Sequence, residues 1–266
     1  MSKKGNAPAA ASEESASKET ALRAYLGRIL GWSEECTQAI EHALRSIALS
    51  VIHRAALVLV GRADLVSIAH ALHRHTLGAD RPFVLCNPRR MEVSEEPHLP
   101  RSYTSGEAAL RAAHGGSLCM LRRRLPDDFL ALVTKVRDPS AAVQIIVCSD
   151  LPHSRHPYLI LPVPIRVPAL KTRARELPRI VDEYAGDALA TLGADAACFT
   201  DDDRRWVLDH AARTLREIET TTLRIVAMRQ TRSVTRAAER LKLSHVAMVY
   251  WYQRRGWRLN PPRGGR

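Results

Sequence analysis

Hydrophobic residues follow two kinds of spacing along the first two thirds of the chain. From Ala21 to about Ser50 they recur at the intervals typical of one helix face, which predicts helix. Short and nearly continuous apolar runs of strand length follow at residues 57–60, 83–86, 117–121, 143–148 and 163–167. Segments with helical spacing lie between several of these runs, at 65–75, 106–113 and 127–136. Continuous apolar strands that alternate with helices predict an α/β fold with a parallel sheet covered on both faces.

The two ends of the chain have other patterns. Residues 1–20 are small, polar and balanced in charge, which predicts a disordered leader. After Arg173 the pattern is helical, with breaks near Gly193 and Asp201. The sequence therefore predicts an α/β body followed by an all-α portion.

The last part of the chain has the pattern of a helix-turn-helix. Residues 222–230 are predicted as a helix, Ser233 as the cap of a second helix at 234–241, and Ser244 as the cap of a third at 245–255. A short turn at Lys242 and Leu243 separates the last two. Small and apolar residues stand where tight packing of the pair needs them: Ala237, Ala238, Leu241, Leu243 and Met248. Such a unit places its second helix in the major groove of DNA.

Charge is concentrated in the same region. The chain has 40 Lys and Arg residues against 28 Asp and Glu residues, a net charge of +12. From Arg204 onward there are 15 against 4, a net charge of +11, whereas the first 203 residues carry a net charge of +1. This asymmetry predicts a polyanionic partner, double-stranded DNA, for the last part of the chain. The residues expected to contact DNA are Arg232, Ser233, Thr235, Arg236, Lys242, Ser244, His245, Arg254, Arg255 and Arg258.

Two other interpretations of this region remain open. The basic helices are also compatible with a surface that packs on the body or on an acidic partner. The aromatic residues Tyr250, Trp251 and Tyr252 are also compatible with a dimer face.

Residues 235–244 (TRAAERLKLS) resemble the Fis-type DNA-binding module, T-R-A-A-E-x-L-G-I-S. Lys242 stands where that module has its turn glycine, which adopts a left-handed backbone more cheaply. Positions on the last helix that are exposed in the module and usually Thr, Arg and Lys are here Ala247, Tyr250 and Trp251. The resemblance therefore supports phosphate contacts more strongly than base readout.

The body resembles the AAA+ domain of sigma-54-type enhancer-binding activators. Collinear motifs carry the resemblance over about residues 35–258: RPFVLCN at 81–87, AAHGGSL at 112–118, VQIIVCSD at 143–150, VPALKTRARELP at 167–178 and LREI at 215–218. It implies a P-loop NTPase-like core at 21–170, a helical lid at 171–215 and a Fis-type helix-turn-helix at 216–266.

The motifs that bind and hydrolyse ATP in this family are not retained. Where a P-loop needs G-x-x-x-x-G-K-[ST], the chain has Gly61, Arg62, Ala63, Asp64 and Leu65. The acidic pair that holds magnesium is replaced by Leu121 and Arg122. By alignment, the sensor asparagine is Asp150, the arginine-finger positions fall on His153 and Leu159 with Arg155 nearby, and only the lid arginine is kept, as Arg216. We therefore expect a vestigial nucleotide site at Gly61, Arg62, Asp64, Leu121, Arg122, Asp150 and Arg216, no cofactor and no enzymatic activity.

The loop with which the family touches the sigma factor, G-A-F-T-G-A, is absent between Leu85 and His114. This absence predicts that remodelling of the sigma factor has been given up together with ATP hydrolysis.

Several other residue clusters are interpreted structurally. His70, His73 and His75 are expected to form a solvated helix face, and Asp201, Asp202 and Asp203 to serve the positive end of a helix. Residues 122–124, three arginines, are expected in a solvated loop. Five widely spaced cysteines have neither metal-clip nor disulfide spacing. Cys86, Cys119 and Cys148 are expected to be buried thiols.

The chain is expected to be soluble and cytoplasmic. Its longest apolar run, residues 55–60, is far too short to span a membrane, and residues 1–20 contain no apolar signal core.

The function expected from these features is a DNA-binding transcriptional regulator with a degenerate AAA+ body, acting as a homodimer or higher oligomer. The alternative is a pseudo-ATPase that modulates a true enhancer-binding activator, a related AAA+ protein, by hetero-oligomerisation. An active ATPase is the class least compatible with the missing motifs.

Overall fold

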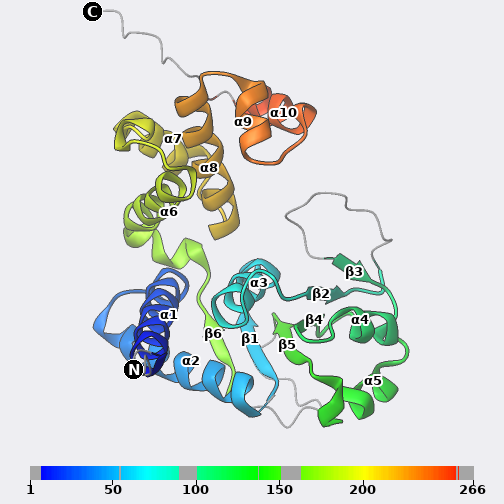
Figure 1. Cartoon of the computed structure of the whole chain (residues 1–266). Helices are drawn as coiled ribbons and strands as arrows, with labels where there is room; N and C mark the ends of the chain where they lie inside the picture. Colours follow the sequence, from blue (N-terminus) through cyan, green and yellow to red (C-terminus); the bar gives the residue numbers. More distant parts are fainter. Residues whose placement is uncertain are drawn as a thin grey trace, which may run out of the picture. The chain divides into compact units, whose positions relative to one another are not determined.

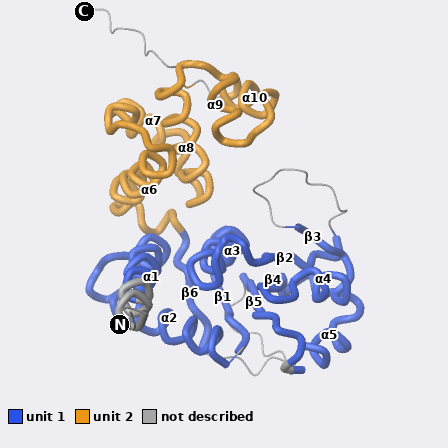
Figure 2. The backbone as a smooth tube through the Cα atoms, in the orientation of Figure 1, with its two compact units in different colours: residues 1–94, 99–169 blue, residues 95–98, 170–266 orange. Residues whose placement is uncertain are grey.

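The computed structural model of the chain describes residues 7–53, 55–89, 101–136, 138–150, 163–255 and 257 (Figure 1). The described residues form two compact units, of which the first extends to Ala169 and the second begins at Leu170 (Figure 2).

The first unit is built on a six-stranded sheet whose order is β3-β2-β4-β5-β1-β6, with every neighbouring pair parallel. The strands are β1 (Leu57–Gly61), β2 (Phe83–Cys86), β3 (Arg101–Tyr103), β4 (Ser117–Leu121), β5 (Gln144–Ser149) and β6 (Ile165–Val167). Strands β2 and β5 are buried along their whole length, and β1 and β4 are buried except at their last residue. This burial explains the continuous apolar runs in the sequence. The unit is an α/β fold with a parallel sheet, as the sequence predicted.

Helices cover both faces of this sheet. On one face, residues of β2, β4 and β5 form a core with α4 (Gly106–Ala112) and α5 (Phe129–Val136), to which Val84, Leu118, Met120, Leu132 and Val147 belong. On the other face α3 (Leu65–Thr76) packs against β1, β4 and β5. The helices α1 (Ala7–Leu30) and α2 (Glu34–His53) complete the unit and contact β6.

The structure differs from the sequence prediction at three places in this unit. The helical stretch predicted over 21–50 is confirmed as helix but is divided between two helices, because the backbone at Gly31 turns with φ +121°. The predicted disordered leader is helical from Ala7; its Ala, Glu and Lys residues have high helix propensity, and the helix continues into the buried residues Leu26 and Ile29. The short edge strand β3 was not predicted, since its residues are Arg, Ser and Tyr rather than an apolar run.

The second unit is entirely helical. It contains α6 (Leu177–Leu192), α7 (Asp201–His210), α8 (Leu215–Thr231), α9 (Val234–Arg240) and α10 (His245–Arg255), with short 3-10 segments at Leu170–Glu176 and Ala196–Cys198. Helix α8 packs against α6 and α7 on the lid side and against α9 of the helix-turn-helix. The segments expected as lid and as DNA-binding region therefore lie in one compact unit, and α8 begins at the boundary predicted between them.

A buried carboxylate ties this unit together. Asp203 is 1% exposed and lies in the first turn of α7, where it forms a capping box with Thr200. Its two oxygens also accept hydrogen bonds from Arg229 Nε and Nη2 of α8, each at 3.0 Å, and from Trp257 Nε1 at 2.9 Å. The acidic run at 201–203 thus serves the positive end of the helix, as predicted. Asp203 also links α7 and α8 to Trp257, two residues beyond the end of α10.

None of the helices in the described ranges combines the length and the apolar character that crossing a membrane requires.

Candidate nucleic-acid interface

The helix pair predicted as a helix-turn-helix, α9 and α10, begins where α8 ends. Arg232 caps α8 in the left-handed conformation, with φ +52°, and its backbone N–H donates to Met228 O. The next residue, Ser233, has an extended backbone, and its hydroxyl accepts from the N–H of Arg236 at the start of α9. These two conformations turn the chain sharply from α8 into α9.

The turn between α9 and α10 has the left-handed residue expected from the sequence. Lys242 has φ +54°, and its N–H donates to Glu239 O at 3.0 Å. The N–H of Leu243 donates to Ala238 O at 2.9 Å, which closes the turn. Ser244 then accepts from the N–H of Ala247 at 3.1 Å and caps α10. Lys242 therefore has a backbone conformation that glycine adopts with less strain.

The interior of the motif is apolar and contains an aromatic residue that was expected at its surface. Ala237, Ala238 and Met248 are buried, as the spacing predicted. Trp251 is also buried, at 6.2 Å from Trp257 between ring centroids, and the Arg224 guanidinium lies over its ring. The expectation of an exposed Trp251 was wrong because it follows Met248 by three residues and so shares its inward face. Trp251 therefore does not form a dimer face.

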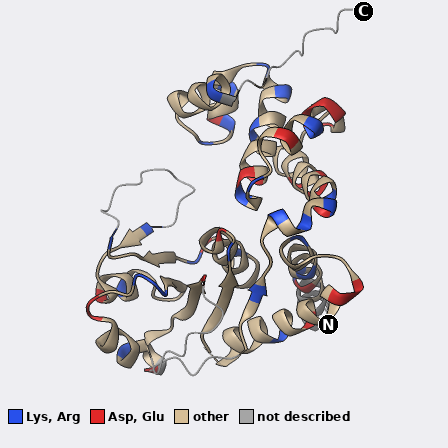
Figure 3. Ribbon diagram, turned by 180° about the vertical axis from the view of Figure 1, so that it is seen from behind, with Lys and Arg blue, Asp and Glu red and all other residues tan. Residues whose placement is uncertain are grey.

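The outer surface of the motif carries most of the residues predicted to contact DNA. The exposed ones are Arg232, Thr235, Arg236, Lys242, Ser244, His245 and Arg254. Ser233 is half-buried and acts as a cap. The side chain of Arg255 and all of Arg258 lie outside the described residues. Lys and Arg residues are distributed over the helices of this unit in Figure 3.

One basic residue in the motif has a structural partner instead. Arg240 Nη2 donates to Leu192 O, the carbonyl at the end of α6. The sequence offered no signal for this contact, because Leu192 is 48 residues away.

The predicted vestigial nucleotide site begins at the end of β1 and the start of α3. Gly61 is the last residue of β1, and a Cβ there would lie 2.2 Å from Val167 O of the neighbouring β6. The pairing of β1 with β6 therefore explains why this position is a glycine. Only Arg62, Ala63 and Asp64 connect β1 to α3, and Arg62 is exposed. The Asp64 carboxylate caps α3 by accepting from Ser67 N–H at 3.4 Å and Ser67 Oγ at 2.7 Å.

The ends of β4 and β5 hold an ion pair. Leu121 is the last residue of β4, and the N–H of Arg122 donates to Cys148 O at 3.0 Å. Asp150, just after β5, pairs with Arg123 at 2.9 Å between Nε and Oδ1, with side chains 62% and 42% exposed. Arg216 belongs to the first turn of α8 in the other unit. The arginine-finger positions His153, Arg155 and Leu159 lie outside the described residues.

The histidines of α3 do not form the solvated face that was expected. His73 is buried, with Nδ1 at 2.8 Å from Ser117 Oγ and Nε2 at 3.0 Å from Arg81 O. His70 packs on the ring of Phe83, and His75 lies 5.0 Å from Tyr25 between ring centroids. Burial lowers the pKa of His73, while the Arg81 carbonyl and the charge of Asp80 oppose this effect.

His73 is one end of a buried row of hydrogen bonds. Ser117 Oγ donates to Gln144 Oε1 at 2.9 Å, Gln144 Nε2 donates to Ser50 Oγ at 3.0 Å, and Ser50 Oγ donates to Ala55 O at 2.7 Å. Because Ser117 and Gln144 begin β4 and β5, the row joins the amino ends of these strands to α2 and α3.

The described part of the chain contains no group of three or more His, Cys, Asp or Glu residues arranged to hold a metal ion. Its five cysteines are free, and Cys86, Cys119 and Cys148 are buried as predicted. Burial raises the pKa of Cys86 to about 11, so this thiol is protonated at neutral pH.

Comparisons with known proteins find similarity at the level of solved structures. Two crystal structures of NtrX from Brucella abortus match, one in complex with ADP and one with ATP, with TM-scores of 0.46 and 0.41 and identities of 16% and 18%. In each case the match covers 92% of this chain and 73% of the NtrX chain. No protein-family model and no curated protein matches the sequence.

Proposed function

We propose that this protein is a DNA-binding transcriptional regulator whose AAA+-like body has lost ATP hydrolysis and the sigma-factor contact loop. The observation that carries the proposal is the capped α9–α10 pair with its left-handed turn at Lys242 and its exposed basic and polar surface. A helix pair of this kind presents its second helix to the major groove while flanking cations neutralise phosphates.

The geometry beside β1 supports loss of the ATPase. In a P-loop protein, phosphate binds at the amino end of the helix after the first strand, where free N–H groups and the helix dipole attract anions. Here the Asp64 carboxylate occupies that end of α3 and bonds Ser67. A second anion at this place would meet like charge. Just beyond the end of β4, Arg123 is a cation beside the position where the family has a magnesium-binding acid. It pairs with Asp150, so this carboxylate is already neutralised by an arginine.

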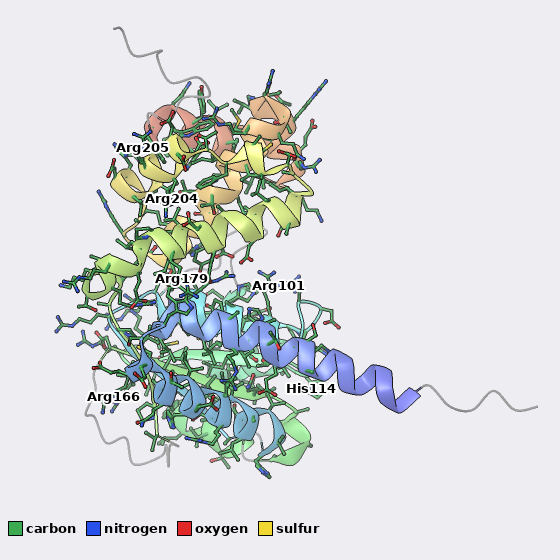
Figure 4. The ribbon with its side chains drawn as sticks, turned by 90° about the vertical axis from the view of Figure 1, so that its left-hand side faces the viewer. Arg101, His114, Arg166, Arg179, Arg204 and Arg205 are labelled. Atoms are coloured by element: carbon green, nitrogen blue, oxygen red, sulfur yellow. The ribbon has the colours of Figure 1, made fainter. Side chains whose placement is uncertain are left out.

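A salt titration of the whole protein on duplex DNA tests the first part of the proposal. We expect fluorescence anisotropy to show affinity that falls steeply with salt, with a slope that decreases by about 0.9 for each phosphate contact removed. Arg236→Ala should weaken binding and lower this slope, because Arg236 is exposed on α9. The matched control is Arg205→Ala on α7, an exposed arginine outside the motif that pairs with Asp202 (Figure 4).

Binding without salt dependence, or equal effects of the two substitutions, would contradict the proposed DNA-binding role. The same preparation is expected to release no phosphate from ATP in the presence of magnesium, and measurable turnover would overturn the second part. We further propose that the protein acts as a homodimer or higher oligomer, which would supply two half-sites.

A further inference from the structure

The exposed face of α10 has an unusual composition for a helix that enters the major groove. Met248 and Trp251 point into the unit, so the opposite face of the helix is free in the described structure. Val246 and Tyr250 lie on that face one turn apart, with exposed fractions of 76% and 56%. His245 precedes them and is also exposed.

The first two turns of α10 contain none of the side chains that most often form hydrogen bonds with base edges. Guanine is most often read by Arg or Lys, and adenine by Asn or Gln, each with two hydrogen bonds. Residues 245–252 (HVAMVYWY) include none of these four types. The first basic side chain, Arg254, comes in the third turn, where its guanidinium lies over the Tyr250 ring at 5.0 Å.

The side chains that are present match another feature of the groove. Thymine is the one standard base with a methyl group in the major groove, and small apolar side chains contact it. The amino-terminal residues of a recognition helix are those that reach base edges, and Val246 is the second residue of α10. The basic surroundings supply the charge complementarity that seats this apolar face on DNA rather than on an apolar protein surface.

We propose that α10 reads the 5-methyl groups of pyrimidines in the major groove through Val246, with Tyr250 beside it, and therefore prefers thymine-containing sites. This inference rests on the proposed DNA-binding function and adds to it the chemical group that is recognised.

Chemically edited DNA tests the inference, because the methyl group can be removed or added without changing base pairing. One mixed-sequence duplex is prepared with thymine, with uracil in place of thymine, and with 5-methylcytosine in place of cytosine, and the whole protein is titrated against all three. We expect uracil to weaken binding by roughly fourfold for each methyl group contacted, and 5-methylcytosine to strengthen it.

Val246→Ala should bring the affinity ratio of the thymine and uracil duplexes close to one while keeping the salt-dependent part of binding. Alanine favours helix, and the site is exposed, so the fold is preserved. Gln253→Ala, at an exposed position of the third turn, is the matched control and should keep the native ratio. Circular dichroism checks the helix content of both variants.

The outcomes separate the two levels of the argument. Salt-dependent binding with equal affinity for all three duplexes would overturn the methyl readout and leave the DNA-binding proposal standing. Lack of salt-dependent binding would overturn both. A concentration-dependent dimer that is lost in Val246→Ala, together with equal affinities, would overturn the inference and assign this face to a second copy of the chain.

Discussion

At the scale of single residues, buried polar side chains make specific contacts inside each of the two units. Asp203 satisfies donors from Thr200, Arg229 and Trp257, and His73 bonds Ser117 and the Arg81 carbonyl. A buried polar group costs about 1–3 kcal/mol when its partner is lost, so these positions tolerate little change.

The lowered pKa of His73 predicts the direction of its contribution to acid sensitivity. Because the folded state depresses this pKa below the ordinary value of 6.5, the unfolded chain binds a proton more readily than the native protein. Stability is therefore highest above pH ~6.5 and falls as the pH drops through that value towards the folded-state pKa. Urea unfolding at a series of pH values should show the free energy of unfolding falling over this range.

His73→Gln should flatten that pH dependence, whatever its effect on stability at neutral pH. The control is His114→Gln, because His114 lies in an exposed turn where it bonds Ala141 O (Figure 4). An unchanged slope in His73→Gln would show that other groups cause the acid loss.

At the scale of elements, the pairing of β1 with β6 depends on the absence of one side chain. Gly61→Ala places a Cβ within 2.2 Å of the Val167 carbonyl, and backbone must move to relieve the clash. We expect a loss of about 2 kcal/mol or more in the free energy of unfolding, measured by urea denaturation.

Gly186→Ala is the opposite case. Gly186 lies inside α6, and a Cβ there meets nothing within 4 Å. This substitution should stabilise the protein by up to about 1 kcal/mol, because alanine has the higher helix propensity. Equal effects of the two substitutions would mean that the close approach of β1 and β6 is not a constraint.

The elements could be predicted from the sequence where burial produces a repeated pattern. The four central strands were identified because they are buried on both faces, and the capping residues Ser233 and Ser244 marked the starts of α9 and α10. The edge strand β3 has no apolar run and was missed. His73 and Trp251 were misplaced because their partners come from other elements, which local spacing does not reveal.

The candidate site was predictable to a similar extent. The exposed basic residues and the left-handed Lys242 follow from the module that the sequence resembles. The cap that Asp64 makes on α3 and the pairing of Arg123 with Asp150 depend on three-dimensional proximity. From the sequence we predicted that nucleotide-binding residues are missing, and the structure shows which contacts the residues at those positions make.

At the scale of the whole molecule, the described chain consists of two compact units of different architecture. The first holds the parallel sheet, and the second holds the α9–α10 pair together with α6, α7 and α8. Since α8 packs against both α7 and α9, destabilising its contact with α7 should affect the α9–α10 pair as well.

Asp203→Asn tests this coupling. It removes the charge that pairs with Arg229, so we expect the second unit to lose about 3 kcal/mol or more. Three of the four tryptophans, Trp206, Trp251 and Trp257, lie in this unit, so the midpoint of the tryptophan-detected unfolding transition should fall.

Asp202→Asn is the neighbouring control. Asp202 pairs with Arg205 at the surface, and its loss should change stability by less than about 0.5 kcal/mol. If both substitutions shift the transition equally, the buried carboxylate does not hold α7, α8 and Trp257 together.

The row of hydrogen bonds from Ala55 to Arg81 has one more contact than it has protons when His73 is neutral. Both ends are carbonyl oxygens, which only accept, and five contacts join them through Ser50, Gln144, Ser117 and His73. Each serine supplies one proton, the amide supplies one across its two contacts, and a neutral imidazole supplies one, so one contact lacks a proton. A doubly protonated His73 completes the row but places a charge in the core. Acid therefore has two opposing effects at this residue, and desolvation is the larger of them.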